Sequence, residues 1–357
     1  MSIRQIIRFD NWWFAKMPPL LAAAYLLILL GGLDIGRAVP VLGGFLLSII
    51  CVASYGHVVN DLFDVEADRR AGKANAVARF GPRRAIVIAI ASALAGWLIA
   101  VLAEYPALAL LLVALNYVWP TIYSVPCIRL KERGLWGVAS DAAGSHITPT
   151  LLALALFAAP TRPVLGDAAP AMVLLVAWSI VQGIKGILNH QVADRDNDEV
   201  AGIVTFATSV PARRLERFLP RFNLWVEWPI SLLLVVSVAR VCPLAVIAFV
   251  VYCLVETAKF RLGFEFALTG GHSRPSFPFV NELFYVCWLP LAAAMQLALL
   301  DPSMLWLPIV HVCLFWRVFR LQARDLRAVA AALQQRFPPP RWVARVAATP
   351  QPPRSPD

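Results

Sequence analysis

The sequence predicts an all-α membrane protein, a polytopic bundle of transmembrane helices. Of its 357 residues, 59% are hydrophobic and only 15% are charged, whereas a soluble domain carries about 25% charged residues. Many apolar runs approach the ~20 residues that a helix needs to cross a bilayer. The sequence has no long alternating pattern of the kind that forms a β-barrel. These observations exclude a soluble enzyme and a barrel.

We expect ten spans, near residues 19–33, 38–60, 84–103, 106–124, 136–159, 171–190, 223–239, 242–258, 281–300 and 303–319. With the N-terminus inside, the N-terminal tail and the four inner loops hold twenty Lys and Arg residues, and the outer loops hold three. Because positive residues gather in cytoplasmic loops, we expect a cytoplasmic N-terminus. We see no signal cleavage site or transit peptide, and we expect the first span to be retained in a plasma membrane.

The chain divides into four expected segments. Residues 1–18 form an interfacial segment in which Trp12 and Trp13 favour the membrane surface, and Pro18 and Pro19 are expected to end it. Residues 19–300 form the transmembrane domain. Residues 301–337 hold the extra span and a basic amphipathic helix that lies on the surface. Residues 338–357 are Pro- and Arg-rich, and we expect them to be disordered.

Two clusters of acids each close an apolar run. The first is Asp61, Asp64 and Asp68, which fall within a ~60° arc of one helix face. The second is Asp194, Asp196 and Asp198. With the expected topology, both clusters lie on the cytoplasmic side. Acids at the ends of membrane helices are costly and usually functional, and carboxylates suit Mg²⁺ that is shared with substrate phosphates. Lys73, Arg129 and Lys131 lie on the same side to offset excess negative charge.

The two acid regions are similar to each other. In the first, His57 precedes Asp61 by four residues, and in the second, His190 precedes Asp194 by four. Each region closes with Ala-Gly, at 71–72 and 201–202. This pattern indicates an internal duplication, which commonly places a site between the repeats. The two histidines are either partners of the acids or structural residues.

Three motifs resemble those of the UbiA superfamily of intramembrane prenyltransferases. HVVNDLFDVEAD is similar to the NDxxDxxxD motif at Asn60, Asp61, Asp64 and Asp68. ADRDNDEVAGI is similar to the second motif at Asp194, Asp198 and Gly202. YSVPCIRLK, residues 123–131, is similar to the Tyr-Ser-x-Pro segment that follows the fourth helix. The resemblance covers residues 8 to 300.

The resemblance implies nine helices around a central cavity and two Mg²⁺ ions that bridge a polyprenyl diphosphate. It implies metal binding by Asp61, Asp64, Asp194 and Asp198, and Asp68 either joins them or orients Lys73. Substrate contacts are expected from Asn60, Asp68, Lys73, Tyr123, Arg129, Lys131 and His190. The allylic C–O bond then ionises, and an acceptor captures the carbocation. We expect a small-molecule or lipid acceptor and membrane lipids as partners, and no nucleic acid.

The acceptor is open, because the sequence departs from members that prenylate aromatic acceptors. It has no Arg-Pro pair after the first motif, and Val204 stands where those members have Lys. Asp141, Ser145 and Thr148 share one face of the fifth span. They either bond neighbouring helices or form an acceptor pocket in which Asp141 accepts a proton. Lys185 points away from Asp194 on a continuous helix and is left out of the site.

Three other functions remain as alternatives. Without an acceptor, the carbocation could cyclise, as in a terpene cyclase of the same superfamily. A second variant transfers a phosphoribosyl group to a polyprenyl phosphate, and the N-terminal RFDNWWFAK resembles that branch. A carrier also uses repeats and membrane acids, but it predicts acids near the bilayer midplane rather than at the cytoplasmic helix ends.

Overall fold

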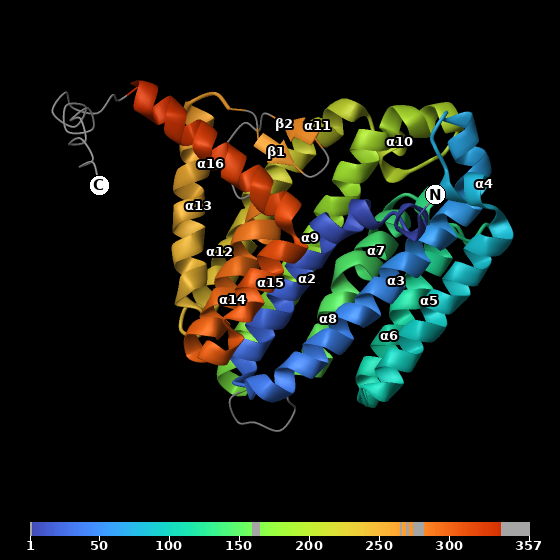
Figure 1. Cartoon of the computed structure of the whole chain (residues 1–357). Coiled ribbons are helices and arrows are strands. Elements are labelled where there is room, and N and C mark those ends of the chain that lie inside the picture. The colour runs from blue at the N-terminus through green and yellow to red at the C-terminus, as the bar shows by residue number, and fades with distance from the viewer. Residues whose placement is uncertain (1, 159–164, 265, 269–270, 274–281, 337–357) are drawn as a thin grey trace, which may run out of the picture.

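The computed structural model describes residues 2–158, 165–264, 266–268, 271–273 and 282–336. Long helices lie side by side in one bundle (Figure 1). They are α2 (Phe9–Gly31), α3 (Ile35–Arg70), α5 (Pro82–Leu102), α6 (Ala107–Ser124), α9 (Leu165–Ala201) and α13 (Pro243–Arg261). Short helices join them: α1 (Ile3–Ile6), α4 (Ala76–Phe80), η1 (Leu130–Glu132), α10 (Phe206–Ser209), α11 (Ala212–Phe222) and η5 (Pro302–Met304). Strands β1 (Phe266–Leu268) and β2 (Gly271–Ser273) form a small antiparallel pair.

The predicted all-α membrane fold is confirmed. Among the described residues, seven helices are long and apolar enough to cross a membrane. They match seven of the ten expected spans, and the segment 284–300 is a shorter apolar helix. The expected core of nine helices remains a prediction. The tail 338–357, much of the segment 269–279 and the start of the ninth span at residue 281 lie outside the described residues.

Three helices contain a five-residue π-helical segment. One joins α7 (Leu135–Ala142) to α8 (Thr148–Phe157), one joins α11 to α12 (Trp228–Ser237), and one precedes α14 (Leu289–Leu300). These segments are η2 (Ala143–Ile147), η3 (Asn223–Glu227) and η4 (Phe284–Trp288). A proline lies two residues after each segment. Because proline has no N–H to donate four residues back, the hydrogen-bond register shifts at each site and the helix continues.

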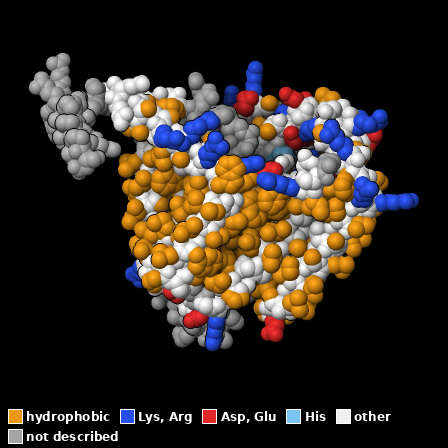
Figure 2. Space-filling view, in the orientation of Figure 1, with side chains coloured by type: hydrophobic (Ala, Val, Ile, Leu, Met, Phe, Trp, Pro, Cys, Tyr) orange, Lys and Arg blue, Asp and Glu red, His pale blue; other side chains and the backbone are white. Residues whose placement is uncertain are grey.

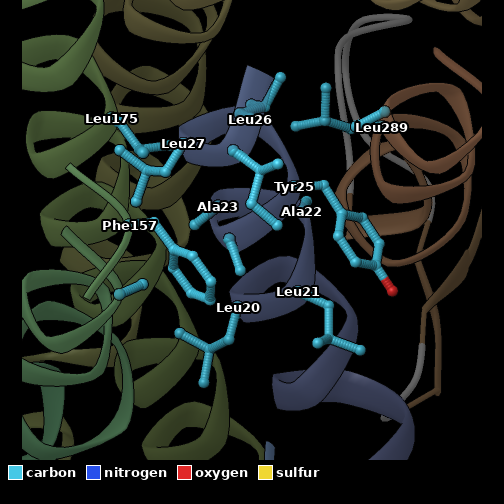
Figure 3. Packing of buried hydrophobic residues seen from close by; sticks show 14 of the residues in the cluster. Leu20, Leu21, Ala22, Ala23, Tyr25, Leu26, Leu27, Phe157, Leu175 and Leu289 are labelled. Carbon is cyan, nitrogen blue, oxygen red and sulfur yellow. The ribbon is translucent and has the colours of Figure 1, made fainter. Parts of the chain in front are cut away.

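Helix α2 forms the centre of the bundle. Its side chains are buried around the whole helix, from Trp12 to Leu30, apart from the half-buried pair at 15–16. Figure 3 shows Leu27 directed toward Phe157 and Leu175, whereas Tyr25 points to the opposite side. The helix passes through Pro18 and Pro19 without ending, so the expected break there was wrong. Packing on all sides holds the helix together where the prolines remove hydrogen bonds.

The expected straight span over residues 303–319 is broken. Helix α15 (Trp306–Leu314) has nine residues, and after Phe315 the chain turns by 81° into α16 (Trp316–Arg336). Nine residues are too few to cross a bilayer. Helix α16 is amphipathic, as expected, because Val318, Gln322 and Val329 face inward and its arginines are mostly exposed.

Two ion pairs fix α16 to the bundle. Asp325 Oδ2 lies 2.8 Å from Nζ of the buried Lys259 in α13. Arg317 Nη1 lies 2.7 Å from Asp10 Oδ1 near the start of α2. Figure 2 shows a broad hydrophobic band with many Lys and Arg side chains above it, at the end where α16 lies. The ion pairs therefore hold α16 along the border of the hydrophobic surface.

We predict that Asp325→Asn loosens α16. Removing a charged partner from the buried Lys259 costs about 2 kcal/mol, and trypsin should then cleave faster after Arg320 and Arg324. The control is Glu66→Gln, which breaks a solvent-exposed pair with Arg69 that contributes little to stability. Equal cleavage rates for Asp325→Asn and the wild type would show that this ion pair does not hold α16.

Candidate active site

Both acid motifs lie on continuous helices that end in the same way. Helix α3 ends before Gly72 (φ 67°), and α9 ends before Gly202 (φ 71°). The N–H of Lys73 donates to the carbonyl of Asp68 at 2.8 Å, and that of Ile203 donates to the carbonyl of Asp198 at 2.8 Å. This pattern is the Schellman motif, in which glycine takes the left-handed position. Each helix therefore stops within three residues of the last Asp of its motif.

The similarity between the two repeats continues beyond the two glycines and shows how the repeats align. Asn75 caps α4 by accepting a hydrogen bond from the N–H of Ala78, and Thr205 caps α10 in the same way. Equivalent positions therefore differ by 130 residues, which pairs Asp64 with Asp194 and Asp68 with Asp198. In this register the counterpart of His190 is Asn60, so the two histidines are not equivalent.

A cavity of about 560 Å³ lies between the repeats. Its wall comes from α2, α3, α6, the helix α7–η2–α8 and α9. Along α3 the lining changes from Ile49 and Val52 to Asn60, Asp64 and Asp68. At 1.5 Å per residue, Ile49 and Asp68 are about 28 Å apart along the helix. The cavity therefore has one mostly apolar end and one charged end.

The charged end gathers most of the predicted acids. Asn60, Asp64, Asp68, Asp194 and Asp198 all line the cavity. Asp61 does not line it, and its side chain is fully buried. Asp196 is exposed and is also outside the cavity. Each repeat thus presents two carboxylates, one helical turn apart, to the same space.

Basic side chains from separate segments offset these acids. Lys131 and Arg129 both contact Asp64 Oδ1, and the Arg129 distance is 3.3 Å. Burial lowers the pKa of Lys131, and the Asp64 carboxylate acts in the opposite direction. Lys73 Nζ lies 3.1 Å from Asp194 Oδ2 and therefore joins the two repeats.

Three further contacts concern predicted residues. His190 and Tyr123 line the cavity, and Nε2 of His190 lies 3.7 Å from Asp194 Oδ2. The suggestion that Asp68 orients Lys73 was wrong, because the Asp68 side chain accepts a hydrogen bond from Asn75 Nδ2 at 2.7 Å. Lys73 pairs with Asp194 instead.

Sequence reasoning missed three polar residues. Arg8 and Lys16 on the N-terminal segment line the cavity, and Arg8 Nε lies 3.2 Å from Asp61 Oδ2. Asn75 Nδ2 also donates to the carbonyl of Asp61 at 2.9 Å. The basic residues in RFDNWWFAK were the available signal, but their contacts with the first motif are long-range.

The polar line on the fifth span divides between two roles. Asp141 and Ser145 line the cavity, and Ser145 Oγ donates to Asp141 Oδ2 at 3.4 Å. Thr148 instead accepts a hydrogen bond from Trp119 Nε1 at 2.9 Å. Lys185 is paired with Glu227 at 2.5 Å, consistent with its exclusion from the site.

The donor set suits Mg²⁺ that is shared with a phosphorylated ligand. Within the described residues, no three His, Cys, Asp or Glu side chains are close enough together to hold a metal by themselves. Mg²⁺ usually takes one or two carboxylates and completes its shell with water and phosphate oxygens. Two carboxylate pairs that face one cavity meet that need.

A family model described as the UbiA prenyltransferase family matches residues 17–263. The chain belongs to the UbiA prenyltransferase family. With its seven candidate spans, this UbiA family member is an integral membrane protein. The matched residues include both acid motifs, whereas Arg8 and Lys16 lie before its start.

Solved structures of a UbiA homolog from Archaeoglobus fulgidus are similar to this fold. The form bound to DMAPP and Mg²⁺ has a TM-score of 0.50 and 14% identity, covering 89% of this chain and 99% of that chain. The form bound to GPP and Mg²⁺ has the same TM-score and identity, covering 88% and 98%. At this identity the likeness shows the fold alone. Curated proteins gave no significant match.

We predict that Asn75→Ala destabilises the end of the first motif. The variant loses the N-cap of α4, which is worth about 1 kcal/mol, and both hydrogen bonds to the end of α3. The melting temperature in detergent should fall, and amide hydrogens of residues 72–80 should exchange faster. Arg79→Ala, an exposed change on the same helix, is the control. Unchanged exchange in Asn75→Ala would contradict this role.

Proposed function

We propose that the protein transfers a prenyl group from a polyprenyl diphosphate to an acceptor within the membrane, in a reaction that requires Mg²⁺. The observation that carries this proposal is the polarity of the cavity. A polyprenyl diphosphate has one strongly anionic end and one apolar end, and the cavity has a matching order of side chains. A carrier for a small polar solute would have no use for the apolar end.

Metal ligands in this proposal come from both repeats. Asp64, Asp68, Asp194 and Asp198 hold Mg²⁺ directly or through water, and Asn60 contributes its amide oxygen. In the Archaeoglobus fulgidus homolog, DMAPP or GPP is bound together with Mg²⁺, which supports the same pairing here. When bound, Mg²⁺ withdraws charge from the leaving diphosphate and lowers the barrier to ionisation.

The basic residues act on the diphosphate. Lys131, Arg129 and Lys73 are each paired with a site acid in the structure. With Mg²⁺ bound to those acids, the same ammonium and guanidinium groups would be available to bind diphosphate oxygens. They stabilise the negative charge that develops as the C–O bond breaks. Tyr123 and His190 lie beside this end of the cavity and complete its polar wall.

The apolar end protects the carbocation. Met17, Leu20, Ile49 and Val52 line this part of the cavity and exclude water that would otherwise quench the cation. The acceptor enters beside Asp141 and Ser145, which lie on another wall. The acceptor nucleophile attacks the allylic carbon, and Asp141 takes the proton that the acceptor loses.

We place the charged end at the cytoplasmic face of a plasma membrane. The support is the excess of Lys and Arg in segments on that side. A donor made by soluble enzymes would then reach the diphosphate site from the cytosol. Cyclisation of the carbocation is the second candidate, because it needs only the ionising end and the apolar wall. The Asp141–Ser145 pair favours transfer over cyclisation.

We predict Mg²⁺-dependent release of diphosphate from prenyl diphosphates such as GPP, in the presence of membrane lipid extract as a source of acceptor. Asp64→Asn and Asp198→Asn should each lower the rate at least 100-fold, because each removes a metal ligand. Mass spectrometry of the organic product separates transfer from cyclisation.

The matched control for that experiment is Asp196→Asn, an exposed acid of the same second motif. It should leave the rate unchanged. If EDTA and the two ligand variants had no effect on diphosphate release, the metal-dependent mechanism would be wrong. If no prenyl diphosphate reacted, the proposed function would fail.

We predict that Asp141→Asn blocks transfer but not binding of the donor. The amide cannot accept the proton, and its similar size preserves the cavity. Transfer to the acceptor should fall at least 100-fold, while the affinity for GPP with Mg²⁺, measured by isothermal titration, stays within twofold of the wild type. Normal transfer by this variant would remove Asp141 from the mechanism.

A further inference from the structure

Asp61 differs from the other acids of its motif. Its neighbours Asn60, Asp64 and Asp68 line the cavity, but the Asp61 side chain is 0% exposed and lies outside the lining. Its position on α3 turns the carboxylate toward the N-terminal segment and α4. Asp61 therefore lies at the edge of the acid face of α3, turned away from the cavity that Asp64 and Asp68 line.

The second repeat supports a different task for this position. With the register of 130 residues, the counterpart of Asp61 is Gln191, which is also buried. Gln191 Oε1 accepts a hydrogen bond from the N–H of Ala207 in α10 at 3.2 Å. The Asp61 carboxylate faces the N–H of Ala76 at the start of α4. In both repeats this side chain is directed to the start of the short helix that follows the motif, and in the second repeat it is not an acid.

Arg8 supplies the counter-charge for Asp61. The Arg8 Nε atom lies 3.2 Å from Asp61 Oδ2, and among the described residues no well-aligned hydrogen bond is made to either carboxylate oxygen. Arg8 has a left-handed backbone (φ 49°) just before α2, a conformation that costs about 1 kcal/mol or more outside glycine. Trp12 Nε1 holds this turn by donating to the carbonyl of Ile7 at 2.8 Å.

Arg129 repeats this arrangement at the next acid. It also has a left-handed backbone (φ 43°), directly before η1, and its guanidinium contacts Asp64. Of the three non-glycine residues with positive φ in the described chain, two are therefore arginines that contact acids of the first motif. Such strained positions persist where the surroundings fix them, and they concentrate at functional sites.

We infer that Arg8 and Asp61 form a positioning pair that fixes the end of α3 and the start of α4 behind the active site, and that Asp61 is not a metal ligand. The inference rests on the proposed function for its catalytic consequence. It assigns a role to the N-terminal segment, which precedes the residues matched by the family model. Asn60, rather than Asp61, then presents the first polar group of the motif to the cavity.

A double-mutant cycle with Arg8→Met and Asp61→Asn tests this inference. Arg8→Met leaves a buried carboxylate without its counter-charge, which is strongly destabilising. We expect the melting temperature to fall by several degrees and kcat for diphosphate release from GPP to fall at least tenfold. Adding Asp61→Asn removes the orphan charge, and it should restore the melting temperature and most of kcat.

The Mg²⁺ dependence separates positioning from ligation. In Asp61→Asn, the Mg²⁺ concentration for half-maximal rate should stay within twofold of the wild type. In Asp64→Asn, it should rise at least tenfold, or activity should be lost. Arg4→Met is the matched control, because Arg4 pairs with Asp10 at the exposed surface. This variant should retain the wild-type melting temperature and kcat.

Two results would overturn the inference. One is a raised Mg²⁺ requirement in Asp61→Asn like that of Asp64→Asn, which would make Asp61 a ligand. The other is a double variant no more stable than Arg8→Met alone. If the wild type released no diphosphate, the proposed function would fail, but the melting temperatures would still decide whether the pair is coupled. The Mg²⁺ dependence of Asp61→Asn and Asp64→Asn would then be measured as the change in melting temperature on adding Mg²⁺ with inorganic diphosphate.

Discussion

Charge balance at the end of α3 and α9 governs the arrangement of this protein. Buried carboxylates without counter-charges would cost several kcal/mol each, so every buried acid of the first motif needs a cation or a strong donor. The chain supplies these from distant segments: Arg8 for Asp61 and Lys131 for Asp64. Asn75 donates to the half-buried Asp68. The loops and the N-terminal segment must therefore fold over the helix ends, and this closes the charged end of the cavity.

Duplication explains how one chain builds such a site. Each repeat ends a membrane helix with two carboxylates, stops it with a left-handed glycine and continues into a capped short helix. The two ends then face each other across one space. Lys73 links the halves by reaching from the first repeat to Asp194 in the second. Because this ion pair connects the two halves, binding of metal or diphosphate at one acid pair changes the electrostatic environment of the other.

Hydropathy was sufficient to predict the helical fold, and motif spacing singled out five acids of which four line the cavity. The spans are readable because each is a local property of the sequence. The contacts of Arg8 and Asn75 cannot be read from the sequence, since both depend on segments that meet only in the folded chain. Helical periodicity grouped Asp61 with Asp64 but could not show which edge of that face borders the cavity. The bend after Phe315 and the passage of α2 through two prolines depend on tertiary packing.

The departure from the family pattern at Val204 falls outside the ionising end of the cavity. Val204, at the position where other members have Lys, is 57% exposed and does not line the cavity, although residues 203 and 205 do. Lys73 and Lys131 already contact the carboxylate pairs without it. Asp141 and Ser145 lie on a different wall. Donor ionisation and acceptor choice are therefore carried by separate residues, so the acceptor can change while the chemistry at the diphosphate stays the same.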